Sequence, residues 1–220
     1  MSAGPGHPLA YPLVVTIGAL AVCAAWAPFG TVDQVAAMVA VALGIVGYTA
    51  YRLGIAFGVL PFWRSGAPRT VRVTRIRQQH RLDSRSWLQV DGSGRPRWLP
   101  VYFEPALIVL TETEAELTDR TIRVAGRRLY PSGRLRDAEP PGRLVDNPSR
   151  PDPDAPAHTA KATRLGRRLL LDAQSTVAAP IVALLWVYID GGGFPVFLAA
   201  TTIGAACAIW LSAVQGSDPS

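Results

Sequence analysis

Four long apolar stretches, two near each end of the chain, dominate the pattern of hydrophobic and polar positions. They cover about 9–27, 35–60, 169–189 and 194–214. Each approaches the length of about 20 residues that an α-helix needs to cross the hydrocarbon core of a bilayer. A short polar joint connects the members of each pair, so we predict two antiparallel transmembrane hairpins, at 1–63 and 169–214. The first stretch also resembles a secretory signal, but it lacks the charged n-region, and we expect it to be retained as a helix.

The segment between the hairpins has a pattern typical of a small β domain. From Thr70 to Leu135, short runs of apolar and β-branched residues alternate with turn sequences such as Asp91–Gly94. Ala106–Thr111 is continuously apolar and is predicted as a buried central strand, whereas Glu112–Thr118 fits either a strand or a helical turn. We therefore predict an all-β cytoplasmic domain over 64–138, a barrel or sandwich of SH3-like or OB-like size. Its core is expected to contain Trp87, Trp98, Leu99, Val101, Phe103, Leu107, Val109 and Leu110.

Two further segments join the β domain to the second hairpin. The range 139–157 is rich in proline and predicts an extended linker rather than a packed element. The range 158–175 predicts a basic amphipathic helix at the membrane interface, because its apolar residues recur at helical spacing among basic ones. After the last apolar stretch, 215–220 is predicted to be a tail. The predicted fold class is therefore an α-helical integral membrane protein with four transmembrane helices and an inserted β domain.

The distribution of basic residues along the chain predicts how the helices are oriented in the membrane. All 22 Lys and Arg residues lie between Arg52 and Arg168, and both predicted hairpin turns contain none. Only 17% of the residues are charged, against about 25% in soluble domains, which excludes a disordered chain and a simple soluble enzyme. Because basic residues favour the cytoplasmic side of a membrane, we predict a multi-pass plasma-membrane protein whose termini and 64–168 insert are cytoplasmic.

Two charged residues fall inside the predicted membrane segments. Arg52 lies near the inner end of the second stretch, and Asp172 lies near the beginning of the third. Charged groups at such depths are expensive unless they are paired or reach the headgroups. Two hypotheses therefore stay open: an ion pair between Arg52 and Asp172 that joins the hairpins, or separate extension of each side chain to the interface.

The basic insert suggests several partners. Residues 64–175 carry a net charge of +8, and anionic lipid headgroups are the most economical explanation for it. A protein partner docked on the β domain, or a second copy of the chain, is the next hypothesis. We do not expect nucleic acid as a partner, because the insert contains no RNA-binding signature. The predicted interfacial basic patch consists of Lys161, Arg164, Arg167 and Arg168.

Small residues at a spacing of four predict close helix packing. Gly54 with Gly58, and Gly204 with Ala208, have this spacing. Such pairs let helix backbones approach, either within one chain or between two copies.

The sequence contains no motif that carries known chemistry. Its three histidines are isolated, and metal-binding, phosphate-loop and dinucleotide-binding spacings are absent. We therefore predict no catalytic residue, cofactor or metal. The predicted function is a non-enzymatic membrane accessory or scaffold protein that presents the β domain to a protein partner. The alternative is a membrane-embedded enzyme or transporter whose polar site forms near the cytoplasmic interface, around Arg52, Asp172 and His80.

Overall fold

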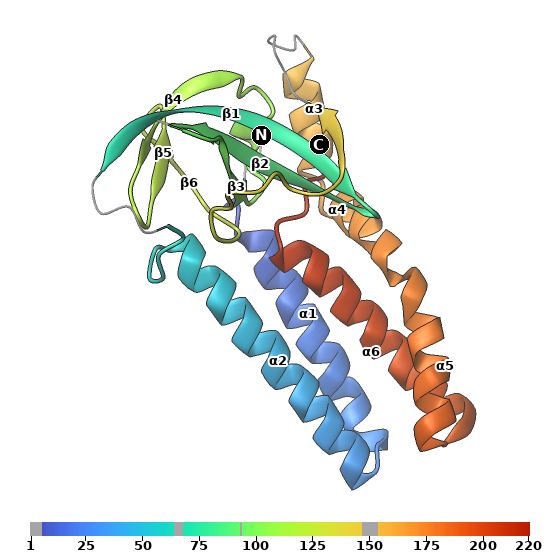
Figure 1. The fold of residues 1–220 in the computed structure, drawn as a ribbon. Coiled ribbons are helices and arrows are strands. Elements are labelled where there is room, and N and C mark those ends of the chain that lie inside the picture. Colours follow the sequence, from blue (N-terminus) through green and yellow to red (C-terminus); the bar gives the residue numbers. More distant parts are fainter. Residues whose placement is uncertain (1–5, 64–67, 93, 147–153) are drawn as a thin grey trace.

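The computed structural model describes residues 6–63, 68–92, 94–146 and 154–220. It has two parts, a bundle of long helices and a curled antiparallel β-sheet domain at one end of that bundle (Figure 1). Both helical hairpins turn at the end of the bundle that is far from the β domain. The predicted division into apolar helices and a separate β domain is therefore confirmed.

Four helices in the described residues are long and apolar enough to cross a membrane. They are α1 (Ala10–Trp26, continued by a 3-10 turn to Phe29), α2 (Val32–Ala56), the composite helix Leu165–Asp190 and α6 (Gly193–Val214). Thr31 caps the N-terminus of α2 with a capping box. Its hydroxyl accepts a hydrogen bond from the Gln34 backbone amide, and the Gln34 side chain accepts one from the Thr31 backbone amide. These helices overlap the four predicted stretches, but the third helix begins earlier and the second ends earlier than the stretches do.

The composite helix is irregular in its middle. It consists of α4 (Leu165–Asp172), a 3-10 segment (Ala173–Ala178) and α5 (Ala179–Asp190). Pro180 lies in the first turn of α5, where its missing N–H removes one α-helical bond to the preceding turn. The hydroxyls of Ser175 and Thr176 bond to carbonyl groups three residues earlier, which satisfies part of this irregular backbone. The 3-10 segment therefore has a local cause in the sequence.

The predicted amphipathic helix over 158–175 is not continuous. Instead, α3 (Ala155–Ala162) ends before Arg164, whose backbone is extended, and α4 follows. The break separates the basic residues into two groups, so they do not form one helical face.

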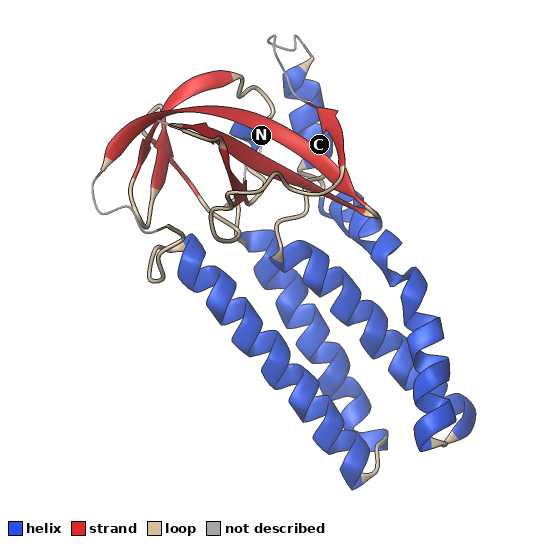
Figure 2. Ribbon diagram, in the orientation of Figure 1, coloured by secondary structure: helices blue, strands red, loops and turns tan. Residues whose placement is uncertain are grey.

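The sheet has seven strands and curls on itself (Figure 2). Its order is β3-β2-β1-β4-β5-β6, and β7 pairs with the second half of β1. The segment after β6 returns to β3 through bridges at Val101–Pro131 and Trp98–Arg136, which links the two ends of the sheet. The strands are β1 (Arg69–His80), β2 (Asp83–Asp91), β3 (Arg97–Val101), β4 (Glu112–Leu117), β5 (Ile122–Val124), β6 (Arg127–Leu129) and β7 (Arg143–Asp146).

Two predictions for the insert are wrong. Ala106–Thr111 is not a central strand, because Pro105 begins a 3-10 turn that buries Leu107 and leaves Val109 56% exposed. The predicted linker at 139–157 contains strand β7, which pairs with β1; residues 147–153 of that linker lie outside the described residues. In the segment Glu112–Thr118, for which a strand and a helical turn were both open, Glu112–Leu117 forms β4.

The core of the β domain reaches into the helical bundle. Leu99, Val101 and Leu107 belong to it as predicted, together with residues of β1, β2, β4 and β5. Ile55 of α2 and Phe62, which follows that helix, are buried in the same cluster. The end of α2 is therefore part of the β-domain core. Of the other predicted core residues, Trp87 and Phe103 are buried, while Trp98 and Leu110 are only partly buried.

The helices pack around a second core and expose apolar side chains on their outer faces. Trp210 of α6 donates a hydrogen bond to the Thr49 hydroxyl of α2 over 2.9 Å, inside a cluster that includes Tyr11 and Ile45. A helix that is apolar both inside and outside a bundle suits a lipid environment. The exposed apolar residues include Val39, Leu43 and Val46 of α2 and Ile181, Leu184 and Leu185 of α5.

Candidate functional site

The C-terminal tail (Gln215–Ser220) is buried in the β domain. After α6, the chain turns at Gly216, whose φ of +86° favours glycine. The tail then runs antiparallel to the beginning of β2, where Arg85 bridges Ser217 and the Asp218 amide donates to the Ser84 carbonyl over 2.8 Å. Strand β3 pairs only from Ser86 onward, so the tail occupies a part of β2 that β3 leaves unpaired.

A buried ion pair fastens the tail. The Arg75 guanidinium of β1 lies 2.8 Å from the Asp218 carboxylate, and the two side chains are 1% and 0% exposed. The Ser86 hydroxyl donates to the same carboxylate, and Ser220 donates to its other oxygen through its amide and hydroxyl, over 2.9 and 2.7 Å. Burial by itself raises the pKa of Asp218, but Arg75 and these hydrogen bonds outweigh it, so the pKa lies below its usual value.

Asp172 forms a second buried polar cluster beside the tail. Its carboxylate accepts from the Tyr11 hydroxyl of α1 over 2.5 Å and from the Ser217 hydroxyl of the tail over 3.0 Å. The Arg168 guanidinium lies 3.8 Å from the centre of the Tyr11 ring. Asp172 therefore connects α4, α1 and the tail.

Arg52 lies near the β-domain end of α2, where it contacts the end of α6. Its Nε donates to the Val214 carbonyl at the end of α6 over 3.4 Å, and Tyr102 donates to the same oxygen over 2.8 Å. Burial raises the pKa of Tyr102 to about 12. The ion pair between Arg52 and Asp172, one of the two open hypotheses, is not formed. Instead, the two residues bind opposite ends of one short segment, Val214–Ser217.

A cavity of about 270 Å³ opens at this junction, and we call it the junction pocket. It lies where the ends of α2 and α6 meet β2, β3 and the segment after β6. Its described lining contains four arginines and no carboxylate. The lining residues are Tyr48, Tyr51, Arg52, Arg85, Trp87, Pro100, Gly133, Arg134, Arg136 and Gln215.

Three of these arginines have no carboxylate partner among the described residues. Arg85, in contrast, pairs with Asp83 at 3.4 Å and also contacts Gln215, and burial lowers its pKa. The three unpaired guanidinium groups lie instead over aromatic rings of the same pocket. The distances to the ring centres are 5.4 Å for Arg52 over Tyr48, 6.0 Å for Arg134 over Tyr51 and 5.4 Å for Arg136 over Trp87.

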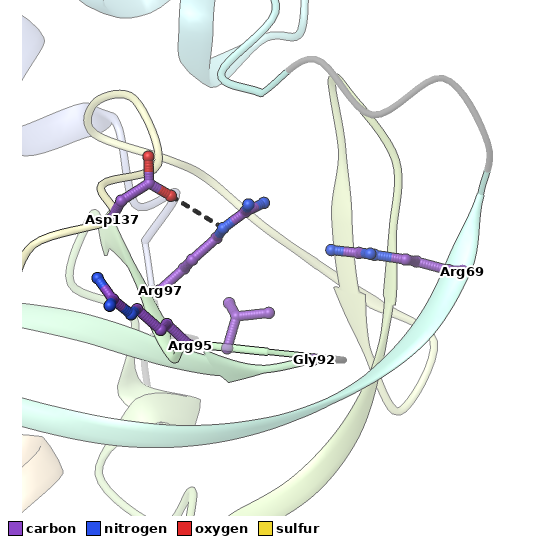
Figure 3. Close-up of a pocket in the computed structure, with 6 residues that line it drawn as sticks. Arg69, Gly92, Arg95, Arg97 and Asp137 are labelled. Atoms are coloured by element: carbon purple, nitrogen blue, oxygen red, sulfur yellow. Dashed lines mark ion pairs between the residues drawn. The ribbon is translucent and has the colours of Figure 1, made fainter.

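A larger opening of about 450 Å³ lies at the edge of the sheet (Figure 3). Arg69 and Arg97 extend toward each other across it, but Asp137 pairs with Arg97 at 2.9 Å. Arg69 also lies 4.0 Å from the ring centre of Trp63. Asp137 lines this opening itself and neutralises part of its positive charge, whereas the described lining of the junction pocket contains no carboxylate.

The four residues of the predicted basic patch differ in exposure and contact different parts of the structure. Lys161 and Arg164 are exposed, whereas Arg167 donates to the Pro219 carbonyl over 3.2 Å and Arg168 covers Tyr11. Two of the four therefore contact the tail and α1. His80, which was expected near the interface, lines a neighbouring cavity of about 300 Å³ that shares Arg85, Trp87 and Arg136 with the junction pocket.

The predicted packing glycines also differ from one another. Gly58 lies beyond the end of α2 with a φ of +75°, against the backbone of Arg120, so it does not share a helix face with Gly54. A Cβ on Gly204 would lie 3.5 Å from that of Ala179, which places this part of α6 against the N-terminus of α5 in the same chain. Ala208 is half-buried in the same helix, and its packing role stays a prediction.

Sequence reasoning missed the tail, although one signal pointed to it. Arg75 follows Val71 and Val73 at a spacing of two, which puts a guanidinium on the buried face of β1. A buried charge of this kind requires a partner.

Comparison with protein-family models, curated proteins and solved structures finds no match for this chain. No group of three or more His, Cys, Asp or Glu in the described ranges could hold a metal ion.

Proposed function

We propose that the four long helices insert into the plasma membrane as two hairpins, with the β domain and both termini on the cytoplasmic side. The Lys and Arg distribution supports this orientation, because all of these residues lie between Arg52 and Arg168 and none lies in the hairpin turns. The far ends of the hairpins instead carry Gln34 and Asp190, which share a hydrogen bond of 3.4 Å.

We further propose that the protein is a non-enzymatic accessory or scaffold protein that presents the β domain to a cytoplasmic protein partner. The buried attachment of Asp218 to Arg75 carries this proposal. The tail continues directly from α6, and Ile55 of α2 enters the core of the β domain. The domain is therefore held at two helix ends, and such an attachment would present one surface at a fixed orientation to the membrane.

The alternative, a membrane-embedded enzyme or transporter, has one observation in its favour, the polar cavity at Arg52. However, the described lining of that cavity has arginine, tyrosine, tryptophan and amide groups without a carboxylate, a histidine, a serine or a cysteine. Asp172 is not among those residues and is bound to Tyr11 and Ser217. These groups suit binding of an anion better than proton transfer or nucleophilic attack.

Orientation is tested with single cysteines in a variant whose Cys23 and Cys207 are replaced. A cysteine at Asp33, exposed at the far end of α2, is expected to react with a membrane-impermeant maleimide in intact cells. A cysteine at Arg123, exposed on β5, is expected to react only after permeabilisation. Labelling of the Arg123 position in intact cells would contradict the proposed orientation.

The scaffold proposal is tested by affinity purification in mild detergent with quantitative mass spectrometry. We expect proteins that co-purify with the wild-type chain to be depleted with Asp218→Asn, which releases the tail. The control is Asp137→Asn, because that side chain is 87% exposed. Recovery of the wild type without a reproducible partner would contradict the proposal. Full retention of the partners by Asp218→Asn would contradict the need for a fixed orientation.

A further inference from the structure

We propose that the junction pocket binds the phosphate group of an anionic phospholipid, with an acyl chain of that lipid lying along α2. This inference rests on the proposed membrane insertion, since it requires the β-domain ends of α2 and α6 to lie at headgroup depth. It assigns a ligand class to a pocket that the scaffold proposal leaves without one.

The charges of the junction pocket match a phosphate. Arg52, Arg134 and Arg136 form no ion pair with a carboxylate of the described residues, and all three line one cavity. Arginine presents several donors in a planar fork, which suits phosphate oxygens. The positive charge there is thus left for an anion from outside the chain.

Arg52 is held in position for this role. Its Nε is occupied by the Val214 carbonyl, and its Nη1 lies only 3.1 Å from where a Cβ on Gly133 would be. The absence of a side chain at Gly133 therefore leaves room for the guanidinium at the pocket wall. The hydroxyl of Tyr48 accepts from Gln215 over 3.4 Å, which ties the aromatic wall to the start of the tail.

The surface of α2 below the pocket favours a lipid over a free phosphate. Ala40, Gly44, Gly47 and Tyr51 share one face of the helix by their spacing, and Tyr51 lines the pocket. All four are exposed, and a Cβ on Gly44 or Gly47 would meet no atom within 4 Å. A smooth open strip therefore runs from the phosphate pocket along the apolar helix, where an acyl chain would lie.

The test is a native mass spectrometry titration of the full chain in a mild non-ionic detergent. Dioleoylphosphatidylglycerol is the probe, dioleoylphosphatidylcholine is the headgroup control, and glycerol 1-phosphate is the control without acyl chains. We expect the wild type to bind phosphatidylglycerol in preference to phosphatidylcholine. Glycerol 1-phosphate at the same concentration should compete weakly. Equal binding of the two lipids would overturn the proposal, and full competition by glycerol 1-phosphate would show a site for soluble phosphates instead.

Variants locate the site. Arg134→Gln with Arg136→Gln removes two exposed charges from the pocket, and Arg123→Gln with Arg143→Gln removes two exposed charges elsewhere. We assume that each basic group strengthens lipid binding as much as it does at an anionic membrane surface. The first variant should then lose affinity for phosphatidylglycerol by a factor on the order of 30, and the second should lose little. Equal losses would overturn the assignment to this pocket.

A second variant tests the acyl strip without changing charge. Gly47→Leu fills the open face of α2 and is expected to weaken binding of phosphatidylglycerol while leaving the affinity for glycerol 1-phosphate itself unchanged. Unaltered lipid binding in Gly47→Leu would overturn the acyl-chain placement. Because the cysteine labelling described above determines membrane insertion separately, a failure of lipid binding is distinguishable from a failure of the proposed topology.

Discussion

Arg75 and Asp218 are 143 residues apart in the chain, and their charged groups lie 2.8 Å from each other with almost no exposure to solvent. Arg75 belongs to the central strand of the sheet, and Asp218 follows the last helix. This pair therefore joins the two parts of the protein directly.

Replacing Asp218 by Asn should destabilise the β domain by about 3–5 kcal/mol, because it leaves the Arg75 guanidinium buried without a counter-charge. Thermal unfolding in detergent measures this loss. The control Asp137→Asn breaks an exposed pair with Arg97 and should cost less than about 1 kcal/mol. Similar losses for the two variants would contradict the special role of the buried pair.

Acid should release the tail. The folded-state pKa of Asp218 lies below its ordinary value of about 3.9. Its ionised carboxylate therefore contributes stability that is fully present above about pH 4 and is lost as the pH falls through the lower, folded-state pKa. Unfolding midpoints of the wild type measured from pH 6 downward should fall more steeply in this acidic range than those of Asp218→Asn. Parallel pH profiles for the two proteins would contradict the assignment of this acid sensitivity to Asp218.

Gly216→Ala should weaken attachment of the tail. The residue has a φ of +86°, and a Cβ would lie 2.7 Å from the Ser132 hydroxyl. We expect a loss of about 1–3 kcal/mol and faster hydrogen exchange at the Asp218 amide. Gly126→Ala is the matched control, since it has a φ of +75° but meets no atom within 4 Å. Gly126→Ala should leave hydrogen exchange in the tail unchanged. Faster exchange in both variants would contradict the idea that contact between the new Cβ at position 216 and Ser132 weakens the attachment.

Tyr11→Phe tests the cluster around Asp172. The substitution removes a hydroxyl that donates to the buried carboxylate over 2.5 Å, so that among the described residues Ser217 is left to donate to it. We expect a loss of about 1–3 kcal/mol, measured as a lower unfolding temperature in detergent. Tyr188→Phe, on a side chain that is 89% exposed, should change little. An unchanged unfolding temperature in Tyr11→Phe would show that the hydroxyl does not hold Asp172.

The features that were predictable from the sequence are those that depend on local pattern. The four apolar helices follow from the length of continuous apolar stretches, and the connection between β2 and β3 follows from the turn residues of Asp91–Gly94. The apolar run after Pro105 was misinterpreted because continuous hydrophobicity does not distinguish a strand from a turn that buries one side chain and exposes another. Leu107 and Val109 have these opposite environments.

The junction depends instead on contacts between distant segments. Arg52 lies in the last turns of α2 and Asp172 in the first part of the composite helix, both toward the β domain, but depth alone does not specify a partner. The carbonyl of Val214 and the hydroxyl of Ser217 belong to a segment of polar and small residues without periodicity. Only the inward position of Arg75 in β1 indicated that a buried acid was needed.

The central claim is that the tail holds the β domain in one orientation on the helices. Its most direct test is a spin-label distance measurement in nanodiscs, with labels on cysteines at Asp33 and Arg123 after replacement of Cys23 and Cys207, which are both free. A single narrow distance distribution in this labelled chain, which broadens when Asp218→Asn is added, is the predicted result. A broad distribution in the presence of Asp218, or one that Asp218→Asn leaves unchanged, would contradict the claim.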